Sequence, residues 1–193
     1  IDEYDLSTPW DISTSTYVQS FDVSSQDTSP RSVRFKGDGT KMYVLGDASD
    51  EVNEYNLSTA WDISSASYNQ TFTLTGQAPY VHGLFLKPDG TKMYVSGNDK
   101  IDEYDLSTAW DVSSAVLNQT FNSSSQGSNI QGIYFKSNGS KMYLVDTNNH
   151  DIYEYSLSTA WDVSSATYTD DFYVASQANF PSDIYIKSDG SAF

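Results

Sequence analysis

Short runs of apolar and alternating residues recur along the whole chain, separated by turn-forming residues. One stretch shows the pattern, with an apolar run at 83–87 (GLFLK), a PDGT turn, a second apolar run at 92–96 and an alternating run at 101–107 (IDEYDLS). Alternation with a period of two places successive side chains on opposite faces of a β-strand. The Asp-Gly or Asn-Gly pair between the first two runs is typical of a tight hairpin. The pattern has no helical periodicity and predicts short strands.

This four-strand pattern is repeated about every 50 residues. Tryptophan occurs four times, at spacings of 51, 49 and 51 residues, within phrases such as EYDLSTAWDVS. These residues are Trp10, Trp61, Trp110 and Trp161. A glutamine marker keeps the same spacings, at Gln26, Gln77, Gln126 and Gln177. Units of about 50 residues with four antiparallel strands are typical of propeller blades. The repeat therefore predicts an all-β fold, a β-propeller with four blades.

The whole chain, 1–193, is expected to form a single propeller domain. The expected blade units are 27–75, 78–124, 127–175, and 178–193 together with 1–26. The last blade would take its first strand from the C-terminal residues and its third and fourth strands from the N-terminal ones, so it would lack most of its second strand. An incomplete blade keeps an unpaired edge. A closed monomer is favoured, and a dimer formed by blade completion is the alternative.

The repeated phrases resemble the YVTN-type and related propeller repeats of secreted and surface proteins, in which a PDG turn precedes a K-x-Y-V strand. The phrases that carry the resemblance are FKGDGTKMYVLG, LKPDGTKMYVSG and FKSNGSKMYLVD. They also look like propeller repeats in phage tail proteins and in bacterial surface proteins of marine origin. The resemblance implies a propeller fold and an extracellular, cell-surface or virion location. It implies little about activity, because propellers host many unrelated functions.

Composition and charge narrow the classes of partner. With 26 acidic and 10 basic residues the formal net charge is −16, so nucleic acid and anionic membranes are poor partners. The chain has no cysteine, which excludes disulfides and thiolate metal sites. It has no run of 18 apolar residues either, and membrane insertion is therefore not expected.

The four tryptophans are interpreted as structural residues of the repeat. Each lies in the same S-T-[AP]-W-D frame, as expected if the indole fills the turn between the third and fourth strands or wedges between blades. The alternative is a set of four aromatic platforms for sugar rings.

A glutamate also recurs in the third strand of each unit. Catalysis by a pair of carboxyls needs two groups with different pKa values, and the equivalent surroundings of these glutamates give no reason for such a difference.

The units differ mainly in the loops on one predicted face, which join successive units and connect the second strand to the third. Loops held by a rigid scaffold commonly carry recognition. The candidate ligand-binding residues in these loops are Arg31, Tyr80, His82, Gln131, Asn149, His150 and Phe180. Aromatic rings with polar neighbours suit a neutral, polyhydroxylated ligand such as a glycan. Most lysines flank the Asp-Gly turns on the opposite face.

Catalytic and metal-binding motifs are absent. The sequence contains no H-x-H, H-E-x-x-H or G-x-S-x-G spacing, so no catalytic residue is predicted and the chain is expected not to be an enzyme. No cofactor is expected, apart from a weak Ca²⁺ candidate at Asp146 and Asp151 or an ion in the channel.

Three functions follow from these observations. The favoured one is a non-catalytic binding or adhesion module of a larger extracellular or virion protein, recognising a glycan, a protein or another surface ligand. The alternatives are a structural repeat module without a ligand and a propeller hydrolase of the lactonase type.

Overall fold

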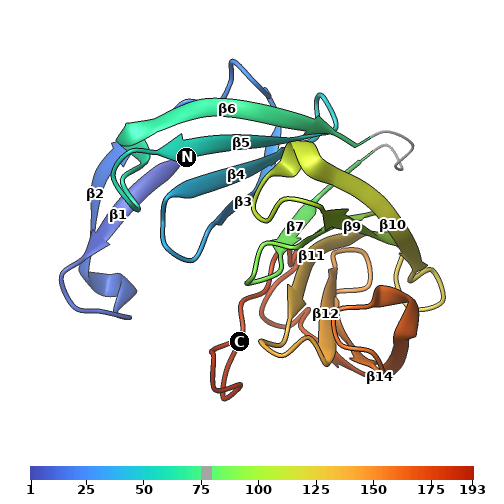
Figure 1. The fold of residues 1–193 in the computed structure, drawn as a ribbon. Helices are drawn as coiled ribbons and strands as arrows, with labels where there is room; N and C mark the ends of the chain where they lie inside the picture. The colour runs from blue at the N-terminus through green and yellow to red at the C-terminus, as the bar shows by residue number, and fades with distance from the viewer. Residues whose placement is uncertain (75–79) are drawn as a thin grey trace.

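The computed structural model describes residues 1–74 and 80–193, and Gln77 and the expected boundary at 75–78 lie outside them. The described residues form fourteen strands in four antiparallel sheets, arranged around a central axis (Figure 1). The helices among them are single 3₁₀ turns, none of which is long and apolar enough to cross a membrane. The predicted all-β propeller architecture is confirmed, and four blades fit it.

Three sheets have four strands each, in sequence order from the axis outward. The first contains β3 (Pro30–Phe35), β4 (Lys41–Gly46), β5 (Glu51–Leu57) and β6 (Ala66–Thr73). The second contains β7 (Gly83–Leu86), β8 (Lys92–Gly97), β9 (Lys100–Leu106) and β10 (Ala115–Asn122). The third contains β11 (Ile130–Phe135), β12 (Lys141–Asp146), β13 (Asp151–Leu157) and β14 (Ala166–Tyr173).

The fourth sheet contains only β1 (Asp2–Leu6) and β2 (Ser15–Ser20). Residues 182–187 follow the course of a first strand but are not paired in a sheet, although Lys187 N donates to Ala192 O in the turn that follows, at 2.9 Å. The C-terminal segment and β1 are therefore not joined by hydrogen bonds in one sheet, and the blade unit of 178–193 with 1–26 stays a prediction. The reason is geometric, because a second strand separates the first strand of a blade from its third, and residues 188–193 form no strand.

The hydrophobic core lies between successive sheets. Apolar side chains of β4 and β5 pack with those of β7, β8 and β9, and a second cluster joins the second and third sheets in the same way. The second strand of each complete sheet supplies fully buried residues such as Met42, Tyr43 and Met93. Because each blade covers its neighbour, the core is continuous around the arc and open where the arc ends.

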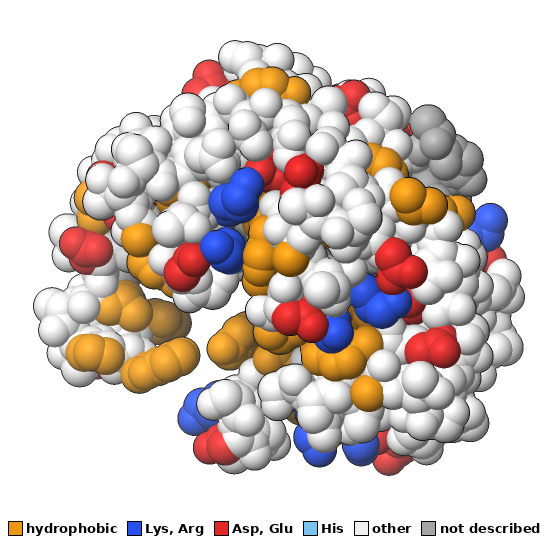
Figure 2. Space-filling model, viewed as in Figure 1, with side chains coloured by type: hydrophobic (Ala, Val, Ile, Leu, Met, Phe, Trp, Pro, Cys, Tyr) orange, Lys and Arg blue, Asp and Glu red, His pale blue; other side chains and the backbone are white. Residues whose placement is uncertain are grey.

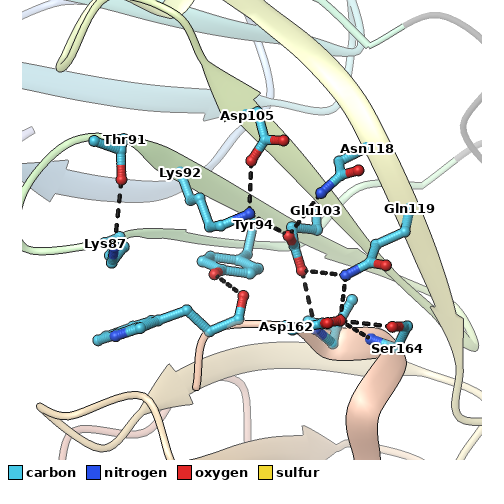
Figure 3. A network of polar contacts seen from close by, with 12 residues as sticks. Lys87, Thr91, Lys92, Tyr94, Glu103, Asp105, Asn118, Gln119, Asp162 and Ser164 are labelled. Carbon is cyan, nitrogen blue, oxygen red and sulfur yellow. Dashed lines mark hydrogen bonds and ion pairs between the residues drawn. The ribbon is translucent and has the colours of Figure 1, made fainter. Parts of the chain in front are cut away.

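Carboxylates on the third strands join successive sheets, and Glu103 is the example in Figure 3. Glu103 on β9 accepts hydrogen bonds from Lys92 (2.5 Å), from Gln119 (2.8 Å) and from the backbone N–H of Val163 in the next blade (2.9 Å). Gln119 also donates to Asp162 of that blade, at 2.6 Å. The glutamate repeated in the sequence is therefore a residue of the seam between blades.

The repeated tryptophans lie at the same seams. Trp110 and Trp161 have φ angles of 66° and 67°, in the left-handed region. Tyr43 and Tyr94 of the preceding blades donate to their carbonyl oxygens, at 2.8 and 2.7 Å. Trp10 departs from the expected role of an indole that fills a turn or a seam, because it is 86% exposed.

Candidate ligand-binding site

A cavity of about 230 Å³ lies where the innermost segments of all four units begin. Its lining residues are Pro30, Arg31, Ser32, His82, Gln131, Ser182 and Asp183. Arg31, His82, Gln131 and Ser182 occupy the same position in the four repeats, five residues after the marker glutamine. The propeller symmetry therefore brings four side chains that are about 50 residues apart in sequence to one mouth of the axis.

Glycine allows the inner strands to approach one another at this mouth. A Cβ atom on Gly83 would lie 2.8 Å from the carbonyl oxygen of Gln131, and one on Gly132 would lie 2.8 Å from the Cα of Asp183. Both distances are shorter than Cβ contacts allow, so these strands can pack this closely only without side chains at 83 and 132. The narrow axis follows from this packing.

Two arginine–aspartate pairs balance the charge around the cavity. Arg31 donates from Nη2 and Nε to one oxygen of Asp47, at 2.7 and 3.1 Å. Arg34 donates to both oxygens of Asp183, at 3.1 and 2.9 Å, and so ties β3 to the C-terminal segment. Each guanidinium has a carboxylate beside it, so the cavity is polar with little net charge of its own.

His82 is the ionisable side chain of the cavity with an unused polar atom. Its backbone N–H donates to Ser96 O at 2.8 Å, while its buried Nδ1 has no hydrogen-bond partner among the described residues. Burial lowers the pKa of His82, and the nearby Arg31 lowers it further, although Asp47 opposes this. The imidazole is therefore neutral near pH 7, with one ring nitrogen whose hydrogen-bonding capacity is unused.

Gln131 is positioned by the neighbouring loops. Its Nε2 donates to Asn129 Oδ1 at 2.8 Å, and Asn129 Nδ2 donates to Asn148 Oδ1 at 3.2 Å. The loops that carry Asn129 and Asn148 are organised by Asp146, which accepts backbone N–H groups from Ser128 and Asn148 at 2.8 and 2.7 Å.

The Asp146 carboxylate of the calcium candidate at Asp146 and Asp151 is engaged by backbone groups. Both oxygens of the Asp146 carboxylate already accept backbone N–H groups, which explains the burial of this residue without a cation. Among the described residues there is no group of three or more histidine, aspartate and glutamate side chains that could hold a metal ion. The calcium site stays a prediction.

The remaining candidate residues lie outside the lining of the cavity. Tyr80 and Phe180 are exposed loop residues, each two positions before a residue that lines the cavity. Asn149 donates to Tyr153, at 2.8 Å, and His150 packs edge-on against Tyr173 in the third complete sheet. Of the seven predicted residues, the structure brings Arg31, His82 and Gln131 together.

Asp183 is a lining residue that the sequence reasoning missed. It occupies the position of Ser32, Gly83 and Gly132 in the other units, so it places a carboxylate where the repeat otherwise has a small residue. This difference between the repeats is visible in the sequence and could have identified Asp183 as a candidate site residue.

Solved structures similar to this chain include β-propellers. The gluconolactonase from the periplasm of Pseudomonas aeruginosa is 17% identical with a TM-score of 0.52, over 74% of this chain and 38% of its own. A Bacteroides fragilis protein assigned as a 6-phosphogluconolactonase is 18% identical with a TM-score of 0.55, over 75% and 39%. The β-propeller domain of Cps50 (Swd1) from Myceliophteria thermophila is 14% identical with a TM-score of 0.52, over 74% and 42%.

These likenesses define the fold class. The chain spans less than half of the length of each of the three structures, at identities that show the fold alone. No protein-family model and no curated protein matches the sequence. The resemblance to YVTN-type repeats is therefore supported as far as the propeller fold.

The prediction that the chain is not an enzyme does not hold, because lactonases are among the structures that share its fold. That prediction relied on catalytic residues being close in sequence. In a propeller the innermost segments of all blades converge on the axis, so His82 and Arg31 meet in one cavity although no local motif contains both.

Proposed function

We propose that this propeller binds a small polyhydroxylated ligand, a sugar or a sugar derivative, in the axial cavity. The observation that carries the proposal is the convergence of Arg31, His82 and Gln131, from three blades, on one polar cavity. At about 230 Å³ the cavity is smaller than the roughly 300–1,000 Å³ of sites for drug-sized ligands, which suits a single sugar ring.

The electrostatics favour a neutral ligand. The two arginines are paired with Asp47 and Asp183, so neither leaves a full positive charge for an anion. The His82 imidazole and the Gln131 amide supply hydrogen-bonding atoms without charge, which match hydroxyl groups. Tyr80 and Phe180 are exposed two positions before His82 and Ser182, and they would supply aromatic surface for a longer glycan. The repeat resemblance supports an extracellular, cell-surface or virion setting for such binding.

Hydrolysis of a sugar lactone is the second candidate. A neutral His82 can accept a proton from water as the water oxygen attacks the lactone carbonyl. The protonated imidazole would then return that proton to the ring oxygen as the ring ester C–O bond breaks, giving a hydroxy acid. The partly exposed Arg31 guanidinium would stabilise the oxyanion. The lactonases among the similar structures support this candidate through their shared fold.

The first test is ligand-detected NMR with D-glucose and a glycan array. We expect binding by the wild type, at least a tenfold loss in His82→Ala, and no change in Lys36→Ala. Lys36 is a suitable control because it pairs with Asp38 at an Asp-Gly turn and does not line the cavity. Equal binding by wild type and His82→Ala would place the site elsewhere, and a stronger effect of Lys36→Ala would place it at the Asp-Gly turns.

The second candidate is tested with D-glucono-1,5-lactone in a pH-stat, with buffer alone as the reference rate. Lactone hydrolysis requires acceleration by the wild type and its loss in His82→Ala. A wild-type rate equal to the buffer rate would reject hydrolysis of this lactone while leaving the binding proposal intact.

A further inference from the structure

The two ends of the arc carry the separated halves of one blade. In the complete blades the indole lies directly over the glycine of the Asp-Gly or Asn-Gly turn, so that a Cβ atom on Gly39, Gly90 or Gly139 would overlap the ring. Gly190 has the same backbone conformation, with φ of 73°, and has nothing within 4 Å of its Cβ position. Trp10 is the indole without a glycine, and Gly190 is the glycine without an indole.

A groove beside Gly190 has the shape of an unfilled seam. It has a volume of about 520 Å³ and lies between the third complete sheet and the C-terminal segment. Tyr143 and Glu154 line it. They correspond to Tyr94 and Glu103, which bind the tryptophan carbonyl and the following backbone N–H of the next blade. The Glu154 side chain is 26% exposed, whereas that of Glu103 is buried.

The turn that contains Trp10 is the matching unused surface. Ile63, Val112 and Val163, two residues after the other tryptophans, are buried at the seams, whereas Ile12 is 84% exposed. The 3₁₀ turn Ile12–Thr14 is nevertheless already formed, with Asp11 accepting from Ser13 N as in the other repeats. Its structure needs no change in order to dock.

We propose that the turn at residues 7–14 docks in this groove of its own chain and closes the ring. Trp10 then covers Gly190, and the Trp10 carbonyl accepts a hydrogen bond from Tyr143. Ile12 fills the apolar part of the groove, and the Ile12 N–H donates to Glu154. Each of these contacts repeats one that the complete blades already make.

The chain's own turn is the favoured occupant because both halves are already fastened to the first complete sheet. Gln19 on β2 donates to Asp62, at 2.8 Å, and Arg34 on β3 holds Asp183. Figure 2 shows the remaining notch between the β1–β2 lobe and the C-terminal segment, with hydrophobic side chains on both sides. Two surfaces held this close meet at a high effective concentration, which favours closure within the chain over association with a second copy.

One position makes this seam weaker than the others. Gln19, Gln70 and Gln119 each donate to the aspartate after the next tryptophan, at 2.8, 2.6 and 2.6 Å. The corresponding residue of the third complete sheet is Asp170, which closure would bring to Asp11. Two carboxylates replace a hydrogen-bonded pair, so closure is opposed by like charge at this point. Asp170→Gln restores the donor and should strengthen the closed ring.

The experiment is acrylamide quenching of tryptophan fluorescence in wild type and Trp10→Phe, combined with light scattering after size exclusion. Closure predicts a monomer in which the Trp10 contribution is protected from quencher. A freely quenched Trp10 would overturn the proposal, and a stable dimer with Trp10 protected would overturn the choice of occupant.

Stability measurements give an independent readout with matched glycines. Gly90→Ala must displace Trp110, whereas Gly190→Ala meets no side chain in the open arc. If Trp10 covers Gly190, the two substitutions should lower the melting temperature by similar amounts, and Asp170→Gln should raise it by several degrees. A Gly190→Ala variant that loses much less than Gly90→Ala, or an Asp170→Gln variant that gains nothing, would contradict closure.

Discussion

Buried polar side chains set the local stability of the blades. Asp102 on β9 is almost fully buried, and Thr120 donates a hydrogen bond to its carboxylate. Burial raises the pKa of Asp102, more than Thr120 and Lys100 together lower it. Asn53 holds the corresponding position on β5, so the repeat itself shows that a neutral side chain fits there.

Asp102→Asn should therefore stabilise the protein near neutral pH. Because the folded-state pKa is raised, the unfavourable burial of the charge is fully present above that pKa and disappears as the pH falls through it. We expect the free energy of unfolding to rise by about 1 kcal/mol at pH 7, with the gain vanishing toward pH 4. Urea denaturation at a series of pH values measures this, and a gain that is independent of pH would show that the charge is not its source.

At the scale of the elements, the turn between the third and fourth strands is held by contacts from two blades. The Trp110 N–H donates to Gly90 O in its own blade at 3.0 Å, and its carbonyl accepts from Tyr43 of the preceding blade. Trp61 makes the first contact, to Gly39 O, at 3.0 Å. The fourth unit has no second strand that could supply the tyrosine, and Trp61 is 53% exposed.

Removing these indoles should have graded effects. Trp110→Ala should lower the free energy of unfolding by about 3 kcal/mol, the lower end of the range for large aromatic residues, since the ring is partly exposed. Trp61→Ala should cost less, because its ring is more exposed. Thermal unfolding followed by circular dichroism measures both. Equal losses would show that contact with the preceding blade contributes little.

The strands were predictable because each depends on a short phrase that occurs three or four times. Lys41–Gly46, Lys92–Gly97 and Lys141–Asp146 all follow a turn with Asp-Gly or Asn-Gly, and all three form second strands. The candidate site was predictable only in part. Arg31, His82 and Gln131 share a repeat position and so share a place at the axis, whereas Asn149 and His150 belong to a different loop whose contacts depend on its own blade.

Whether the ring is open or closed could not be derived from counting the strands. Counting places the first strand at 182–187 and the third strand β1 in one blade, but these strands are not neighbours in a sheet and cannot pair directly. The positions of the two ends depend on side-chain packing at the seams and on the Arg34–Asp183 pair, which holds the C-terminal segment to β3, and neither leaves a periodic signal in the sequence. The same packing decides whether the axial cavity is bounded on all sides.

For the whole molecule, the net charge of −16 opposes compact packing of the blades. Most ion pairs, such as Lys36–Asp38 and Lys87–Asp89, lie at the surface and contribute little to the free energy of unfolding. Salt that screens these pairs therefore removes little stability. Screening of the general repulsion should therefore dominate the response to salt.

We expect the melting temperature to rise by several degrees between about 10 mM and 500 mM NaCl, because the Debye length falls from about 30 Å to a few ångströms over this range. Differential scanning calorimetry at constant pH measures the change, and KCl should act as NaCl does, since the effect depends on ionic strength. A melting temperature that falls with salt would mean that the surface and seam ion pairs, including Arg34–Asp183, contribute more to stability than the repulsion takes away.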